Sequence, residues 1–195
     1  MKYQLPEHQA EILPNLLRLK TSEEIALSEF EGFLKAEILL TERLTNRTKF
    51  TNAYVLNIHT LALKHLYPFA GKYRDVNMSK GGFPFAAAKF LSQTMLSFED
   101  EILSALPNKY KSKEDLIRDI AIVHGEFLVI HPFREGNGRT ARILANLMAR
   151  KQGYKPLRFD EVGEKEFTMY VSAVHSSAKK EYEKMFEFIR SIFPV

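Results

Sequence analysis

Apolar residues recur at helical spacing along most of this chain. Between residues 116 and 130 they fall four, three, four and three positions apart and so share one helix face; they are Leu116, Ile120, Val123, Phe127 and Ile130. Similar spacing occurs upstream in EEIALSEFEGFLKAEILLTERL and NAYVLNIHTLALKHLY. It also runs through EFTMYVSAVHSSAKKEYEKMFEFIRSIF, which we predict to be one long amphipathic helix. The pattern predicts a mainly helical fold.

The segment HPFREGNGRTAR, residues 131–142, interrupts this helical pattern. The preceding helix should end near His131, because Pro132 has no amide hydrogen and disfavours helical backbone in the residue before it. A second helix is predicted to run from Arg139 through ARILANLMARKQ, with Gly153 as its C-terminal cap. The segment would then be the loop between two helices.

One further segment departs from helical spacing. YRDVNMSKGGFPF has β-favouring residues on both sides of Gly81-Gly82, which is the composition of a short hairpin. The fold class predicted from the pattern is therefore mainly α with one β-hairpin.

Composition narrows the classes of protein. A chain of 195 residues with 45% hydrophobic residues can bury one good core. We expect a core at 49–195 preceded by a helical arm at 1–48. The absence of cysteine excludes disulfides, thiol catalysis and thiolate metal sites. No apolar run approaches the roughly 20 residues that span a bilayer, and the start of the chain lacks a signal-peptide pattern, so we expect a cytoplasmic protein without a membrane partner.

Charge adds one local feature. The net charge of +4 could suggest nucleic acid, but the basic residues are spread along the chain and form no tract, which argues against such a partner. Residues 131–151 are the exception, with five basic residues against the single acid Glu135. This local excess suits a small polyanion.

The loop segment has the residues of a phosphate site. Gly136, Asn137 and Gly138 come just before a predicted helix N-terminus, where backbone amides can surround an anion. Arg139 and Arg142 lie three apart and can reach the same anion from one helix face. Their guanidinium groups suit phosphate oxygens. We therefore interpret the segment as a phosphate-binding loop.

Two further residues suggest a reaction. Glu135 would repel a bare phosphate, so we interpret it as a ligand of a Mg²⁺ ion that bridges phosphate oxygens. Free histidine has a pKa of about 6.5, so His131 could accept a proton from an incoming hydroxyl. Together these groups fit transfer of a phosphorus-containing group to a hydroxyl. They do not indicate which phosphate is attacked.

HPFREGNGRTAR resembles, at every defined position, the signature of the Fic (Fic/Doc, or Fido) family, His-Pro-Phe-x-Asp/Glu-Gly-Asn-Gly-Arg-x-x-Arg. FAGKYRDVN at 69–77 and the helix before it extend the similarity. The resemblance implies the helical Fic fold with a β-hairpin flap. It also implies a protein adenylyltransferase, with ATP as co-substrate and Mg²⁺ as cofactor, that transfers AMP to a Ser, Thr or Tyr hydroxyl and releases pyrophosphate.

The resemblance also implies a role for each residue of the motif. His131 would be the base, Glu135 the Mg²⁺ ligand, Phe133 the anchor of the loop, Gly136, Asn137 and Gly138 the anion hole, and Arg139 and Arg142 the ligands of the β- and γ-phosphates. The Doc branch, which resembles a kinase, has a lysine in place of Gly138. The glycine in this chain favours nucleotidyl transfer.

The hairpin falls where the family has its flap, whose exposed edge docks a target protein by strand addition. Its candidate docking residues are Lys80, Gly81 and Gly82.

Family members are often restrained by a helix with the pattern Ser/Thr-x-x-x-Glu-Gly/Asn, whose glutamate pairs with the second motif arginine. LSEFEG at 27–32 offers Glu31 as this glutamate, although Leu27 stands in the Ser/Thr position. The alternative is that Glu31 is an ordinary exposed acid on an amphipathic helix.

Two other functions remain open at this stage. The same loop could transfer another phosphate-linked group, such as UMP, GMP or phosphocholine, because an anion hole contacts phosphates and not the base. The chain could also be a regulatory module that binds nucleotide without turnover. The sequence does not indicate the target protein or the oligomeric state.

Overall fold

The computed structural model describes residues 12–194. The α-helices of this part are α1 (Ser22–Glu42), α2 (Asn52–Leu63), α3 (Leu91–Phe98), α4 (Lys113–Ile130), α5 (Asn137–Lys151), α6 (Glu164–Ser177) and α7 (Glu183–Ile192). The strands are β1 (Ser79–Lys80) and β2 (Phe83–Pro84), and the short helical turns are η1 (Ala88–Phe90), η2 (Glu99–Leu103) and η3 (Phe159–Glu161). The mainly helical prediction is confirmed.

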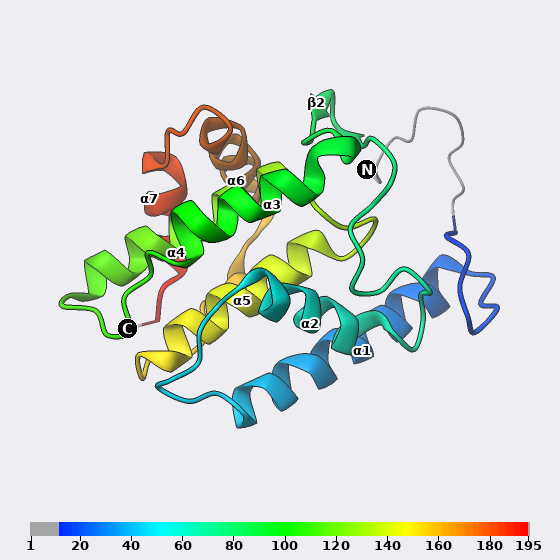
Figure 1. The fold of residues 1–195 in the computed structure, drawn as a ribbon, viewed down its shortest axis with the longest axis horizontal. Helices are drawn as coiled ribbons and strands as arrows, with labels where there is room; N and C mark the ends of the chain where they lie inside the picture. The colour runs from blue at the N-terminus through cyan, green and yellow to red at the C-terminus, as the bar shows by residue number, and fades with distance from the viewer. Residues whose placement is uncertain (1–11, 195) are drawn as a thin grey trace.

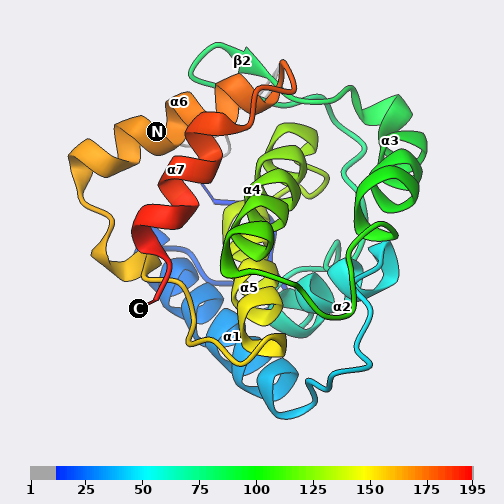
Figure 2. The ribbon, with the colours of Figure 1, turned by 90° about the vertical axis from the view of Figure 1, so that its left-hand side faces the viewer.

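Helices α4 and α5 form the centre of the fold. Figure 2 shows them enclosed by α1 and α2 on one side, α6 and α7 on another, and α3 opposite these. The five apolar residues predicted to share one face of α4 are all buried, at 5% exposure or less. The loop between α4 and α5 carries HPFREG, and α5 begins with Asn137 and Gly138, two residues before the predicted start at Arg139. The central pair of helices therefore holds the candidate site.

Helix α1 packs onto this centre. Its N-terminus has a capping box in which the Thr21 side chain and Glu24 exchange hydrogen bonds with each other's backbone. Ile25, Phe33 and Leu40 on its inner face join the same hydrophobic core as residues of α2, α4 and α5. Figure 1 shows α1 alongside α2. Of the segment 1–48 that we expected to be an arm, residues 1–11 lie outside the described part of the chain, and α1 is packed against the core.

The predicted hairpin is present. β1 and β2 pair antiparallel, with Ser79 opposite Pro84 and Lys80 opposite Phe83. Gly81 and Gly82 form the turn with φ of 56° and 80°, which a two-residue hairpin turn requires and which glycine adopts without strain.

The C-terminal prediction of one long helix is wrong, because the chain forms α6 and α7 with a turn between them. In this turn Lys180 has a φ of 62°. The Lys180 Nζ and the Tyr182 hydroxyl both donate hydrogen bonds of 2.6 Å to the carboxylate of Glu126 on α4, which is 6% exposed. A buried carboxylate needs such partners, and the turn supplies them.

Among residues 12–194, no helix combines the length and the apolar character that crossing a membrane requires.

Candidate active site

His131 ends α4 in an unusual backbone conformation. Its φ of 53° and ψ of 59° place it in the left-handed region, which redirects the chain into the motif loop. Arg74, only 4% exposed, holds this bend by donating from Nε to the His131 carbonyl at 2.8 Å. The same guanidinium donates to the carbonyls of Val76 and Ala86, which flank the hairpin. One buried arginine therefore fixes both the motif loop and the base of the flap.

The imidazole of His131 is buried and oriented. Its Nδ1 lies 3.2 Å from the carbonyl oxygen of Leu128. Because a carbonyl only accepts, Nδ1 carries the proton of the neutral ring and Nε2 carries the lone pair. Burial is the main cause that lowers the pKa of His131 to about 3, and the charges of Arg74 and Lys80 act in the same direction. At neutral pH the ring is therefore a neutral base.

The flap covers this imidazole. The Phe85 ring, just after β2, stacks on the His131 ring with centroids 3.8 Å apart and an angle of 11° between planes. Phe83 stacks instead on His175 of α6, at 4.7 Å. Lys80 is exposed on β1 and close enough to His131 to affect its pKa. The structure thus brings the predicted docking hairpin next to the predicted base.

The motif loop is braced from inside by Asn137. Its side chain accepts a hydrogen bond from the Phe133 amide at 2.8 Å and donates one to the Phe133 carbonyl at 2.7 Å. Phe133 itself is fully buried and stacks on His59 of α2 at 3.8 Å. The Asn137 side chain therefore shapes the loop, and the backbone amide of Asn137 is the group left to donate a hydrogen bond to an anion.

His59 joins the motif loop to the segment 69–77. Its Nδ1 accepts from the Gly71 amide at 2.8 Å, so its Nε2 carries the proton and donates to the Glu135 carbonyl at 3.0 Å. Burial is the main cause that lowers the pKa of His59 to about 4. The neutral ring is therefore the form that makes both bonds.

Helix α5 begins inside the motif with an open N-terminus. Gly136 is its N-cap with a φ of 78°, and a Cβ there would lie 2.8 Å from the Phe33 ring. The first intrahelical bond runs from the Thr140 amide to the Gly136 carbonyl, so the helix supplies no acceptor for the amides of residues 137–139. A Cβ on Gly138 would meet nothing within 4 Å. These amides and this open space suit an anion.

Glu135 is a single carboxylate beside the open N-terminus of α5. Its Oε1 accepts from the Gly136 amide at 2.8 Å and lies 3.4 Å from an Arg139 nitrogen. Among residues 12–194, no group of three or more His, Cys, Asp or Glu side chains gathers into a metal site. Mg²⁺ often binds proteins through one or two carboxylates while substrate phosphates and water complete its shell. One carboxylate beside a phosphate site fits that mode.

The two motif arginines point to different neighbours. Arg139 lies against α1, where its guanidinium pairs with Glu29 at 2.8 Å and sits 4.6 Å from the Phe33 ring centre. Arg142 lies over Phe159, 5.6 Å from the ring centre. Its buried Nε has no hydrogen-bond partner among the described residues. Of the two motif arginines, Arg142 is thus the one with a buried donor still to be satisfied; Arg150 and Arg158 outside the motif share this feature.

The structure does not place Glu31 at the motif. Glu31 lies on the outer face of α1 and pairs with Lys35 at 3.3 Å, with both side chains more than half exposed. Glu29 occupies the inner face at 7% exposure, where it accepts from the Tyr67 hydroxyl at 2.6 Å and pairs with Arg139. The two residues are separated by 200° around the helix, so only one of them can reach the motif.

Sequence reasoning missed Glu29, Tyr67, Arg74 and His59 as neighbours of the motif. Glu29 carried a usable signal, because it lies in helical register with Ile25, Phe33 and Leu40, which are all buried. The others come from segments distant in sequence, and no spacing connects them to the motif.

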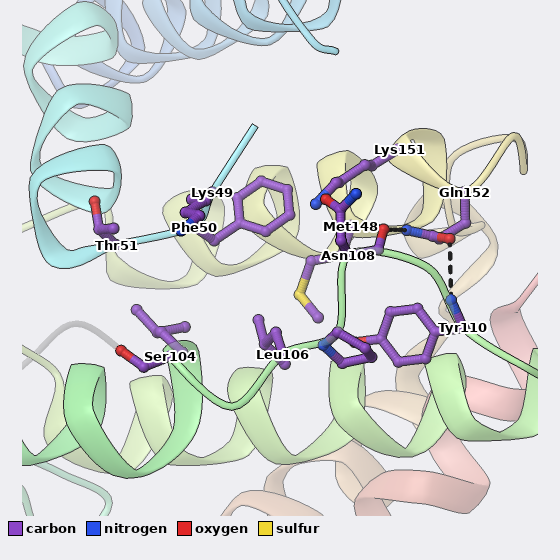
Figure 3. A pocket seen from close by; sticks show the side chains of 12 residues that line it. Lys49, Phe50, Thr51, Ser104, Leu106, Asn108, Tyr110, Met148, Lys151 and Gln152 are labelled. Atoms are coloured by element: carbon purple, nitrogen blue, oxygen red, sulfur yellow. Dashed lines mark hydrogen bonds between the residues drawn. The ribbon is translucent and has the colours of Figure 1, made fainter. Parts of the chain in front are cut away.

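A separate cavity of about 230 Å³ lies near the other end of α5. Its lining includes Lys49 before α2, Tyr110 before α4, and Lys151 at the end of α5. The Gln152 amide donates to the Asn108 carbonyl at 3.1 Å and accepts from the Tyr110 amide at 3.4 Å (Figure 3). Since α5 has 15 residues and is about 22 Å long, at 1.5 Å per residue, this cavity is remote from the motif loop.

Comparisons with known proteins agree with the motif. The family model described as Fic/DOC family matches residues 49–149. Among curated relatives, protein adenylyltransferase Fic of Nematostella vectensis is 34% identical over 110 residues, which are 55% of this chain and 25% of that protein. Protein adenylyltransferase Fic of Drosophila willistoni is 30% identical over 131 residues, 67% of this chain and 26% of that protein. The matched segment spans about a quarter of these relatives.

Solved structures show the same fold. The N-terminal FIC domain of the Bep8 protein of Bartonella sp. 1-1C superposes with a TM-score of 0.79 at 20% identity, covering 96% of this chain and 92% of that one. A Fic domain from Bartonella quintana, solved with bound ADP, superposes with a TM-score of 0.76 at 21% identity, covering 97% and 94%. The family model matches more than half of this chain, and the chain belongs to the Fic/DOC family.

Proposed function

We propose that the protein is a protein adenylyltransferase that transfers AMP from ATP to a Ser, Thr or Tyr hydroxyl of a target protein. The observation that carries the proposal is the neutral, oriented His131 beside the open N-terminus of α5. Relatives named protein adenylyltransferase support the choice of AMP as the transferred group.

In this proposal the target hydroxyl oxygen attacks the α-phosphorus, and the bond from that phosphorus to the pyrophosphate oxygen breaks. His131 Nε2 takes the hydroxyl proton, and pyrophosphate leaves. The amides of Asn137, Gly138 and Arg139 stabilise the negative charge, because they point from a helix N-terminus into the open space over Gly138. When bound, Mg²⁺ would be held by Glu135 and would neutralise phosphate charge.

The arginines have different parts in the proposal. The buried Nε of Arg142 makes it the arginine that is ready to bind the terminal phosphates. Arg139 is held by Glu29, so Glu29 is the restraining glutamate in this proposal; it acts on the first motif arginine, not on the second one that the sequence pattern assigned to Glu31. The flap, including Lys80, Gly81 and Gly82, would dock the target segment by strand addition next to His131.

The experiment is incubation of the purified protein with Mg²⁺ and ATP labelled at the α- or the γ-phosphate. We expect protein labelling from the α-position that falls by about 10²–10⁴-fold in His131→Ala. His65→Ala, which changes an exposed histidine that contacts Ser28, is the matched control and should keep full labelling. Label from the γ-position alone would identify a kinase. Absence of label with ATP, UTP, GTP or a phosphocholine donor would favour a silent binding module.

The restraint by Glu29 is tested in the same assay. Glu29→Gln keeps the shape of the side chain but removes the charge that holds Arg139, so labelling should rise several-fold. Glu31→Gln changes a carboxylate two residues away on the exposed face and should leave labelling unchanged. An increase in Glu31→Gln alone would restore the assignment made from the sequence.

A further inference from the structure

Helix α1 has two apolar faces, and the chain covers only one of them. The inner face buries Ile25, Phe33, Ala36 and Leu40. The opposite face carries four large apolar side chains at spacings of three, four and four, with exposures of 60%, 62%, 48% and 52%; they are Leu27, Phe30, Leu34 and Ile38. We call these four residues the outer stripe.

The outer stripe is unusual for this molecule. The other exposed large hydrophobic residues among 12–194 lie in twos and threes on other segments, and none of these segments carries four of them in a row at helical spacing. A helix that is apolar on opposite faces is normally covered on both. Figure 2 shows α1 along the edge of the bundle, with α2 and α5 on its inner side. A continuous apolar stripe in this place indicates an interaction surface.

The charges beside the stripe indicate what covers it. At 100° per residue, Glu31 and Lys35 both lie on the same flank of the stripe. Their side chains are 53% and 76% exposed. If a second α1 packs antiparallel across the stripe, with a twofold axis near residue 33, this flank meets the same flank of the second helix. Glu31 of each copy then lies opposite Lys35 of the other, and the two apolar stripes face each other.

We propose that the outer stripe of α1 is the contact surface of a homodimer, in which the α1 helices of two copies pack antiparallel about a twofold axis. The contact is isologous, because the apolar stripe of one copy meets the apolar stripe of the other and the charged flank meets the other charged flank. Helix α1 is about 31 Å long, at 1.5 Å per residue, so the paired stripes can interdigitate over three turns.

The test is sedimentation velocity of the full chain from low to high micromolar concentration. The wild-type mass should rise from 22.5 kDa toward twice that value. Leu34→Glu places a charge in the stripe and should give a monomer at every concentration. Leu96→Glu on α3 is the matched control, because Leu96 is 52% exposed and Leu34 48%, and it should dimerise like the wild type. Circular dichroism checks that both variants keep their helices.

Charge reversal tests the orientation of the two helices. Glu31→Lys alone and Lys35→Glu alone should each weaken the dimer, because each puts like charges opposite one another twice. The double variant should restore it. Because the chain has no cysteine, Leu34→Cys also offers a clean cross-link: its two copies near the axis should form an intermolecular disulfide, whereas Leu96→Cys should not.

A wild-type protein that stays monomeric over the whole concentration range would overturn the proposal, and so would a dimer that Leu34→Glu and Leu96→Glu affect equally. A dimer lost in Leu34→Glu but unaffected by either charge reversal would overturn the antiparallel arrangement. These measurements read mass and cross-linking, so their result is independent of the proposed transferase activity.

Discussion

The motif loop and the flap lie in contact, but they are built in different ways. The loop is fixed from within by side chains that are almost fully buried: Asn137 bonds both backbone groups of Phe133, His59 bonds Glu135, and Arg74 bonds His131. The flap has two strands of two residues each and a turn of two glycines around which no atom crowds.

This difference fits the task that we propose for each region. A group that moves a proton must be held in a fixed geometry, and buried hydrogen bonds to backbone provide that rigidity. A surface that accepts segments of another protein needs an accessible edge and can tolerate local opening. We therefore expect perturbations of the loop to affect the stability of the whole fold and perturbations of the flap to affect mainly the site.

The largest expected effect is acid destabilisation by three buried histidines. His59 and His131 lie at the motif loop, and His124 lies on α4 with its Nε2 2.8 Å from the Tyr170 hydroxyl. Burial is the main cause that lowers the pKa of His59 to about 4, and of His124 and His131 to about 3. The unfolded chain binds these protons near pH 6.5, so stability is full above that pH and is lost as the pH falls. Each histidine should reduce the free energy of unfolding by about 2 kcal/mol at pH 5 relative to pH 8.

Urea unfolding at pH 8, 7, 6 and 5 measures this loss. His124→Gln should reduce the pH dependence by about a third, because one titrating group is removed. Carboxylic acids ordinarily have pKa values of about 4, so the slope between pH 7 and 5.5 belongs mainly to histidine. A flat stability over that range would show that the three rings are protonated in the folded state.

A smaller effect on stability distinguishes Asn137 in the motif loop from Asn77 beside the flap. Each of these side chains accepts a hydrogen bond from a backbone amide. Asn137→Ala leaves the buried amide and carbonyl of Phe133 without partners and should cost about 3 kcal/mol, or about 10 °C in Tm. Asn77 lies before the flap, is exposed, and accepts from the Ala88 amide at 2.8 Å. Water can replace that bond, so Asn77→Ala should cost less than about 1 kcal/mol. Differential scanning calorimetry compares the two, and equal losses would remove the distinction between loop and flap.

Much of this arrangement could be predicted from local chemistry. The face of α4 followed from apolar spacing, the end of α4 at His131 from Pro132, and the flap turn from Gly81-Gly82. Gly153 ends α5 as expected, with a φ of 87° and its amide bonded to the Arg150 carbonyl at 2.9 Å. In each case the cause lies within a few residues of its effect.

The remainder depended on contacts between distant segments. The break after α6 serves Glu126, more than 50 residues earlier, and apolar spacing continues across it. On α1 the family pattern pointed to Glu31, because Gly32 follows it. Only the packing of the helix shows that Glu29 lies on the buried face and Glu31 on the exposed one. Arg74 stands in a segment with no helical spacing, and only the fold brings it to His131.

The next prediction concerns function rather than stability. Phe85→Ala removes the flap ring that covers His131, and water entry should raise the pKa of this histidine from about 3 toward its ordinary value. AMP transfer by the variant should then decline as the pH falls from 8 to 6, whereas wild-type transfer should not decline through this group. Phe83→Ala is the control, because Phe83 stacks on His175. Superimposable pH profiles for all three proteins would show that the flap does not set the protonation of His131.

The smallest expected effect lies in the flap turn. Gly82 has a φ of 80°, and a Cβ there would meet nothing within 4 Å, so any cost of Gly82→Ala comes from the backbone alone. That cost is about 1 kcal/mol for an L-residue in the left-handed region, and Gly82→Asn should cost less because asparagine tolerates that region. The effect should be local: the Phe85 amide, bonded to the Met78 carbonyl at 3.1 Å, should exchange about five times faster in Gly82→Ala while Tm changes by less than about 3 °C. Faster exchange throughout α4 and α5 would instead mean that the flap and the motif loop unfold as one unit. The flap would then not open independently of the loop, and the difference in rigidity between the two regions would be wrong.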